Sequence, residues 1–242
     1  MKIKEKLLTY TRENLQTEGP INVVIFGDSV SHASFNCYQN YESVYWNRLR
    51  KKLNKTRAYM PVNMICAAIG GTSAHASLER LDKQVLKHEP DLVIVCFGLN
   101  DVNGDYDRYI NSLREIFERC TAAGVEVIFL SPNMLNTYVA ADTKEDVAEY
   151  AKKTAAMQNE GRMDRYIYGA MDLAREMGVA VCDCYSIWKE RSKTEDVTML
   201  LANRINHPTE EMHELFAEEL YKLIMSDGSD EQGAYDSGMF KG

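Results

Sequence analysis

Residues 21–31 read INVVIFGDSVS, a nearly continuous apolar run that ends in glycine, aspartate and serine. Runs rich in Val and Ile are typical of strands that are buried on both faces of a parallel sheet. Four further runs of this kind follow, at Val62–Cys66, Leu92–Phe97, Val125–Leu130 and Val179–Cys182. We therefore predict five strands, of which the first spans Ile21–Phe26.

Amphipathic segments with helical spacing lie between these runs and after the last one. They are Tyr41–Leu53, Ser73–Lys87, Tyr106–Ala123, Asp142–Met177 and Glu210–Met225. Because strands and helices alternate along the chain, we predict an α/β fold in which helices cover both faces of one parallel sheet. Residues 1–226 are expected to form a single domain. The glycine- and acid-rich residues 227–242 are expected to be a disordered acidic tail.

The composition is that of an ordinary globular protein, with 45% hydrophobic and 26% charged residues among 242. Lys and Arg number 28 against 36 Asp and Glu, and this net charge of −8 disfavours nucleic acid or an anionic membrane as the main partner. The first residues resemble neither a signal peptide nor a membrane span, so we expect a cytoplasmic location. The six cysteines are expected to be reduced, and their spacing is a poor zinc signature.

Residues that follow the strands are the candidates for a site, because open parallel sheets bind ligands at the carboxyl ends of their strands. Ser29 follows the first predicted strand, Gly71 the second and Asn100 the third. His207 precedes the last predicted helix and supplies an imidazole.

These residue types are the ones that an enzyme needs to catalyse acyl transfer. Ser29 is a candidate nucleophile, and His207 is a candidate base that accepts its proton. The N–H groups of Ser29 and Gly71 and the side-chain amide of Asn100 are the donors that we expect to form an oxyanion hole. A nucleotide-binding role is disfavoured, since the sequence contains neither G-x-G-x-x-G nor a P-loop.

The set resembles the four blocks of the SGNH hydrolases, also called the GDSL esterase/lipase family, which supply Ser, Gly, Asn and His in this order. Gly27-Asp28-Ser29 is similar to the first block, Gly71 to the second, Gly98-x-Asn100-Asp101 to the third and His207-Pro208 to the fourth. The likeness extends from residue 27 to residue 208. It implies a three-layer α/β/α, flavodoxin-like fold with a five-stranded parallel sheet, and hydrolysis of esters or thioesters without a cofactor or a metal.

One position departs from the family pattern. Members usually carry an aspartate three residues before the histidine, where it orients the imidazole, and here this position is Arg204. Either a backbone carbonyl or Asn203 holds the ring of His207, or another carboxylate, Asp101 or Asp183, takes this part. We expect Arg204 to point to solvent, because a guanidinium beside the imidazole disfavours its protonation.

Neighbouring residues of the same types are assigned other roles. Ser31 is expected to shape the turn around Ser29, and Ser73 to cap the following helix. His213 is expected to be a packed or surface residue, while His32 follows Ser29 closely enough to line the site.

The sequence thus predicts a serine esterase that hydrolyses a small O-acyl ester, such as an acetylated carbohydrate, through an acyl-enzyme intermediate. Its partner is then a small-molecule acyl ester. An acyl-thioesterase or lysophospholipase that uses the same residues is an alternative, and so is an ester- or glycan-binding module that has lost turnover. The loop Pro132–Asp142 fits the wall of a substrate pocket and a cover over the core equally well. No motif encodes the oligomeric state.

Overall fold

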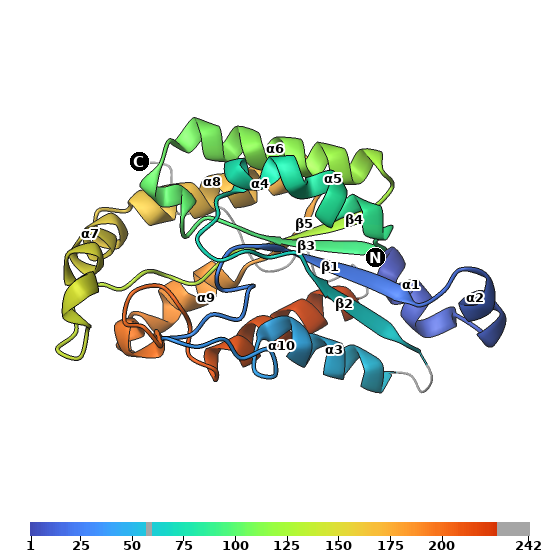
Figure 1. Cartoon of the computed structure of the whole chain (residues 1–242), viewed down its shortest axis with the longest axis horizontal. Helices are drawn as coiled ribbons and strands as arrows, with labels where there is room; N and C mark the ends of the chain where they lie inside the picture. The colour runs from blue at the N-terminus through green and yellow to red at the C-terminus, as the bar shows by residue number, and fades with distance from the viewer. Residues whose placement is uncertain (57–59, 227–242) are drawn as a thin grey trace.

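Five parallel strands form one sheet in the computed structural model, which describes residues 1–56 and 60–226 (Figure 1). In chain order they are β1 (Ile21–Gly27), β2 (Val62–Cys66), β3 (Leu92–Cys96), β4 (Glu126–Leu130) and β5 (Ala180–Cys182). Their order in the sheet is β2-β1-β3-β4-β5, as in flavodoxin-like folds. The predicted fold class and all five strands are confirmed, with ends that differ by at most one residue. The predicted tail, residues 227–242, lies outside the described residues.

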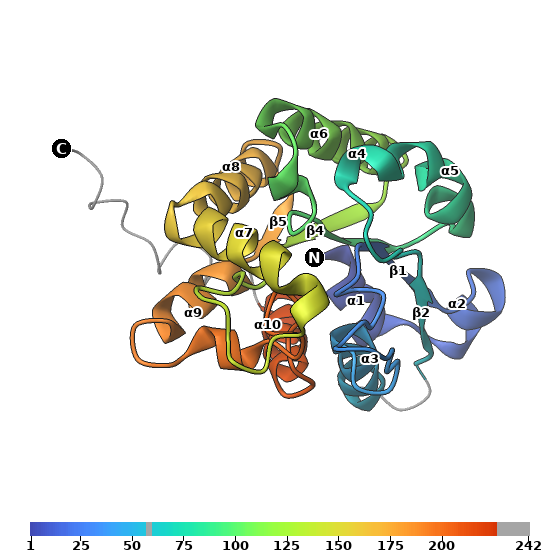
Figure 2. The same ribbon diagram turned by 60° about the vertical axis from the view of Figure 1, so that its left-hand side comes forward.

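Helices cover both faces of this sheet (Figures 1 and 2). One face carries α4 (Ala74–Ser77), α5 (Leu81–Gln84), α6 (Tyr106–Ala122) and α8 (Arg162–Glu176). The other face carries α1 (Lys2–Thr9), α3 (Tyr45–Thr56) and α10 (Met212–Met225), with α9 (Cys184–Arg191) packed beside α10. The remaining α-helices are α2 (Arg12–Thr17) and α7 (Ala148–Asn159), and short 3-10 turns are η1 (Leu78–Arg80), η2 (Leu86–His88), η3 (Asp101–Asn103), η4 (Glu145–Val147) and η5 (Val197–Leu200).

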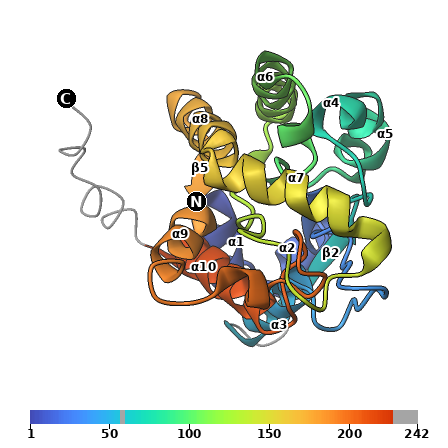
Figure 3. The same cartoon turned by 90° about the vertical axis from the view of Figure 1, so that its left-hand side faces the viewer.

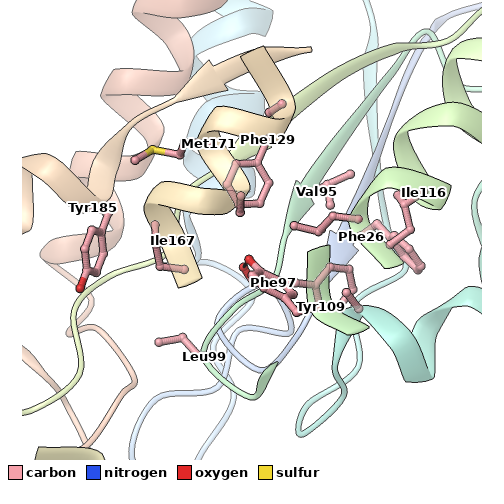
Figure 4. Close-up of a cluster of buried hydrophobic side chains, with 14 of the residues drawn as sticks. Phe26, Val95, Phe97, Leu99, Tyr109, Ile116, Phe129, Ile167, Met171 and Tyr185 are labelled. Carbon is pink, nitrogen blue, oxygen red and sulfur yellow. Dashed lines mark hydrogen bonds between the residues drawn. The ribbon is translucent and has the colours of Figure 1, made fainter. Parts of the chain in front are cut away.

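The strands send alternate side chains into two cores, one on each face of the sheet. From β1, Val24 and Phe26 enter the core beneath α6 and α8, where Phe97 and Ile167 join them (Figure 4). The intervening Ile25 enters the opposite core, against α3 and α10. These side chains are fully buried. Burial on both faces explains why the central strands β1, β3 and β4 read as nearly continuous apolar runs, whereas the edge strand β2 exposes Asn63.

The helix predictions are correct in part. Three predicted helices are confirmed as α3, α6 and α10, whereas α1, α2 and α9 were not predicted. The single helix expected at Asp142–Met177 is wrong: Gly161 takes a left-handed φ of 75°, which ends α7 and starts α8. The helix expected at Ser73–Lys87 is instead a series of short pieces, in which the four-residue helices α4 and α5 alternate with the 3-10 turns η1 and η2.

The carboxyl ends of the strands lie on the side of the molecule that faces the viewer in Figure 3. Helix α7 crosses this side. The loops after β1 and β2 and the segment before α10 also reach this side. In the described parts of the chain, no helix is long and apolar enough to cross a membrane.

Candidate active site

Ser29 lies in a tight turn directly after β1. The N–H of Val30 donates to the side chain of Asp28 at 3.1 Å. The N–H groups of His32 and Ser34 donate to the backbone oxygens of Asp28 and Ser29, each at 2.9 Å. These bonds fix the backbone on both sides of Ser29, so its hydroxyl is presented in one orientation at the end of the strand.

Close packing beneath the turn explains the glycine that precedes it. A Cβ atom on Gly27 would lie 2.6 Å from the backbone oxygen of Cys96 and 2.6 Å from Oγ of Ser31. Ser31 itself is fully buried; its Oγ shares a hydrogen bond of 2.8 Å with the Tyr45 hydroxyl, and its backbone oxygen accepts from the indole of Trp46. Ser31 therefore shapes the turn, as expected, and has no access to a substrate.

The imidazole of His207 joins Ser29 to a backbone carbonyl. Nε2 of His207 lies 2.9 Å from Oγ of Ser29, and Nδ1 lies 2.5 Å from the backbone oxygen of Phe35. A carbonyl oxygen only accepts, so the hydrogen of the neutral ring belongs on Nδ1. Nε2 is then left with a free lone pair directed at the Ser29 hydroxyl, which is the tautomer that a general base requires.

The surroundings of His207 keep its ring neutral. Burial lowers the pKa of His207 below the ordinary 6.5, and the hydrogen bond to the Phe35 carbonyl opposes this shift. The imidazole is consequently available as a base at neutral pH and somewhat below it.

None of the side chains expected to orient the ring contacts it. Both ring nitrogens of His207 are engaged by Ser29 and Phe35. Oδ1 of Asn203 instead accepts the backbone N–H of His207 at 2.9 Å, so it fixes the main chain and not the imidazole. Asp101 accepts the N–H of Ala74 at 2.9 Å.

Asp183 and Arg204 are also placed differently from the expectations. Asp183 caps α9 by accepting the N–H of Ser186, and it follows β5, which is three strands away from β1. Arg204 does not point freely to solvent, because its guanidinium pairs with Asp142 at 3.0 Å and donates to the backbone oxygen of Leu201. Of the alternatives left open by the sequence, the geometry matches the backbone carbonyl.

The expected oxyanion donors gather around Ser29. Among the described residues, the N–H groups of Ser29 and Gly71 have no acceptor, whereas that of Gly70 donates to Nδ1 of His32 at 3.2 Å. A Cβ on Gly70 would lie 3.7 Å from that of Ser29, which places this glycine turn directly beside the serine.

The side-chain amide of Asn100 is engaged in the structure. It donates to the backbone oxygen of Thr72 at 3.0 Å and to the carboxyl group of Asp28 at 3.4 Å. An oxyanion that binds Asn100 must therefore take over one of these hydrogens, and the longer bond to Asp28 is the weaker of the two.

Two buried carboxyl groups lie beneath the site. Burial raises the pKa of Asp28 to about 7, against the hydrogen bond from Val30, and the nearby Asp101 adds to the increase. Burial likewise raises the pKa of Asp101 to about 6. Both carboxyl groups are therefore harder to ionise than an exposed aspartate.

Several secondary expectations are met. Ser73 caps α4 through its side chain, which accepts the N–H of Ala76. His213 is fully buried, with Nδ1 accepting the N–H of Tyr45. His32 lines the site through its bond to the glycine turn.

The loop Pro132–Asp142 covers part of the core, which is one of the two roles expected of it. Met134 and Leu135 are buried in the core, while Tyr138 is 42% exposed. Tyr138 lines a cavity of about 480 Å³ between this loop, α7 and α9, and that cavity does not include Ser29 or His207.

The sequence did not predict two features of the site, namely which residue accepts from Nδ1 of His207 and the role of Arg80. The acceptor for Nδ1 is a backbone oxygen, and any residue type at position 35 would supply one, so no sequence signal identifies it. Arg80 donates to the backbone oxygens of Gly27, the last residue of β1, and of Ala67, the residue after β2. From sequence alone, a single arginine in an amphipathic segment is expected to be exposed. The hydrogen bonds of Arg80 to the backbone become evident only from the structure.

Comparison with known proteins places the chain in a family. Residues 25–215 match the model of the GDSL-like lipase/acylhydrolase family. No curated protein matches the chain.

Solved structures share the fold at low sequence identity. The acetylxylan esterase Axe2 from Geobacillus stearothermophilus is 18% identical with a TM-score of 0.67, over 86% of this chain and 95% of that one. The lipase/acylhydrolase from Enterococcus faecalis is 19% identical with a TM-score of 0.65, over 85% and 95% of the two chains. LAE5, an alpha/beta hydrolase enzyme from the metagenome of Lake Arreo, Spain, is 19% identical with a TM-score of 0.67, over 85% and 96%. By its family match over most of its length, the chain belongs to the GDSL-like lipase/acylhydrolase family and is a carboxylic ester hydrolase of the SGNH type.

Proposed function

We propose that the protein hydrolyses a small O-acyl ester through an acyl-enzyme intermediate on Ser29. The observation that carries this proposal is the chain of contacts from Oγ of Ser29 through His207 to the Phe35 carbonyl. It supplies a nucleophile, a base in the correct tautomer and a group that holds that base.

The reaction follows from this geometry. Oγ of Ser29 attacks the ester carbonyl carbon as its proton passes to Nε2 of His207, and the carbonyl oxygen becomes an oxyanion. The N–H groups of Ser29 and Gly71 and the amide of Asn100 donate to it. When the intermediate collapses, the bond to the alcohol oxygen breaks and that oxygen takes the proton from His207.

Deacylation repeats the same steps with water. A water molecule attacks the acyl-Ser29 ester and gives its proton to His207. Collapse of the second intermediate releases the carboxylic acid, and the proton returns to Oγ of Ser29. The imidazolium formed in each half-reaction is stabilised by the backbone carbonyl of Phe35, whose oxygen accepts the Nδ1–H.

An acetylated carbohydrate is the substrate class that we favour. Two proteins with solved structures of this fold, AlAXEase and Axe2, are named acetyl xylan esterases, which supports testing such substrates first. Tyr38 and Tyr41 are 53% and 45% exposed, and their rings lie against Phe35 and His32, which contact the site. Each tyrosine offers a flat apolar face and a hydroxyl, a combination that suits a sugar ring. The cytoplasm is the location that we propose for this reaction.

A panel of p-nitrophenyl esters from acetate to octanoate, together with an acetylated xylo-oligosaccharide, tests the proposal. We expect the highest kcat/KM on acetyl esters, loss of turnover in Ser29→Ala, and wild-type turnover in the matched control Ser73→Ala. Full activity of Ser29→Ala would overturn the proposal. A preference for octanoate would replace the proposed substrate with a long-chain acyl ester.

A further inference from the structure

The carbonyl that holds His207 belongs to a loop between β1 and α3. Phe35 sits in a narrow turn of this loop, where its N–H donates to the backbone oxygen of Tyr38 at 3.0 Å, and Ser34 and Gln39 form an antiparallel bridge. The ring of Phe35 is fully buried, stacked on Tyr38 and packed against His213. The direction of the Phe35 carbonyl therefore depends on the whole turn and not on Phe35 alone.

One carboxylate gathers the donors of this loop. Oε1 of Glu210 accepts from the Tyr38 hydroxyl and from Nδ2 of Asn40, both at 3.0 Å, and Oε2 accepts from Oγ of Ser43 at 2.7 Å. The Ser43 bond is the main cause of a lowered pKa for Glu210, with Asn40 and Tyr38 contributing. Arg48, on α3, donates to the backbone oxygen of Glu210 at 3.0 Å.

Glu210 is also tied to the histidine. It stands three residues after His207, in the segment that leads into α10. Asn203 fixes the other side of His207 by accepting its backbone N–H. Both partners of the bond between His207 and Phe35 are thus anchored to the same short segment, one through the main chain and the other through the Glu210 side chain.

We propose that Glu210 is a positioning residue that aims the Phe35 carbonyl at Nδ1 of His207. In the family pattern, an aspartate three residues before the histidine orients the imidazole by direct contact. In this chain Glu210, three residues after His207, orients the imidazole indirectly, through the Phe35 carbonyl. The inference rests on the proposed function of Ser29 and His207, and it adds a residue to which neither the family pattern nor the sequence assigned a role. Glu210 does not touch the ring, so it contributes only through the loop.

Three variants separate this role from a general structural one. Glu210→Ala removes all three acceptor bonds, and because small misplacements of a catalytic group are costly, we expect kcat to fall by about 10- to 100-fold with little change in KM. Glu210→Gln keeps an acceptor for Tyr38 and Asn40, while Oγ of Ser43 can accept from its amide, so we expect it to restore most of the activity. Glu211→Gln, the neighbouring exposed acid, is the matched control and is expected to behave as wild type.

The Nδ1–H resonance of His207 in proton–nitrogen NMR gives a readout that needs no substrate. In the wild type and in Glu211→Gln we expect a hydrogen-bonded, downfield signal, and in Glu210→Ala its loss or an upfield shift. If Glu210→Ala fails to fold, Ser43→Ala removes the shortest of the three bonds and is expected to shift the same signal and lower kcat to a smaller extent. A folded Glu210→Ala or Ser43→Ala with unchanged signal and unchanged kcat would overturn the proposal.

The two proposals fail in different ways. Absence of ester hydrolysis by the wild type would refute the proposed function, but the NMR comparison would still decide whether Glu210 orients the carbonyl. An active wild type whose kcat and Nδ1–H signal are indifferent to Glu210 would refute only the positioning role.

Discussion

Arg80 offers a quantitative test of how the sheet supports the site. Its guanidinium lies 4.6 Å above the ring of Phe26 and donates to the backbone oxygens of Gly27 and Ala67, at the ends of β1 and β2. It also donates to Oγ of the buried Ser77 at 2.9 Å. Arg80 thus ties together the two strands whose following turns carry the proposed nucleophile Ser29 and the glycine pair.

Replacing Arg80 with methionine keeps an unbranched chain over Phe26 but removes every donor. The backbone oxygen of Gly27 retains the N–H of Ile69, whereas that of Ala67 loses the donor identified for it, at a cost of about 1–3 kcal/mol. The lost bond to Ser77 adds about 1 kcal/mol, and relief of the buried charge offsets part of the sum. We expect a net loss of about 1–3 kcal/mol, or roughly 2–12 °C in Tm for a domain of this size.

Urea and thermal unfolding of Arg80→Met measure this loss, and kcat on an acetyl ester measures its effect on the turns. Arg175→Met is the control: its side chain is 51% exposed and, within residues 1–56 and 60–226, pairs only with Asp172, so the stability of this variant should change by less than about 0.5 kcal/mol. If the Arg80→Met variant is as stable and as active as the wild type, the reasoning about Arg80 is refuted.

Three further predictions concern the site. Asn100→Ala should lower kcat by about 100- to 1000-fold with little effect on KM, as for the loss of an oxyanion donor; a change confined to KM would assign Asn100 to substrate binding. The acid limb of kcat/KM should have its midpoint below pH 6.5, since burial lowers the pKa of His207 and the base must be neutral; a midpoint at or above 6.5 would contradict this. The pKa of Asp28 is raised to about 7, so the folded chain holds this proton more tightly than the unfolded one, and the contribution of Asp28 to stability falls as pH rises from about 4 to about 7. In urea unfolding at a series of pH values, Asp28→Asn should lack this pH-dependent contribution to the free energy of unfolding. An unchanged pH dependence would contradict the prediction.

The strands were the most predictable part of the fold. The central strands β1, β3 and β4 are largely buried on both faces, so short runs rich in Val, Ile, Leu and Phe specified them within one residue. The edge strands β2 and β5 are only partly buried, yet shorter apolar runs located them equally closely. The helices were less predictable, because their limits depend on single positions. Gly161 looks like an ordinary glycine inside an amphipathic segment, yet its left-handed backbone divides that segment into α7 and α8. The first helix was missed although Ile3 and Leu7 bury its inner face, since the charges between them mask a two-residue stripe.

Ser29 and His207, whose side chains carry the proposed chemistry, were predictable from the sequence. Ser29 and His207 stand 178 residues apart, and their order and position after predicted strands indicated that they meet at one sheet edge. The acceptor for Nδ1 was not predictable as a residue, because a backbone oxygen has no side-chain signature. The same reason hid Arg80, whose partners are backbone oxygens, and Glu210, whose partners lie on a loop with no regular pattern.

Covalent labelling with a fluorophosphonate tests the central claim, that Ser29 is a nucleophile activated by His207, most directly. Intact-mass analysis and peptide mapping of the labelled protein report both the extent and the position of the reaction. We predict one adduct on the wild type, located on Ser29, and none on Ser29→Ala or, on the same time scale, on His207→Ala. An adduct on another serine, or labelling of His207→Ala at the wild-type rate, would contradict the account.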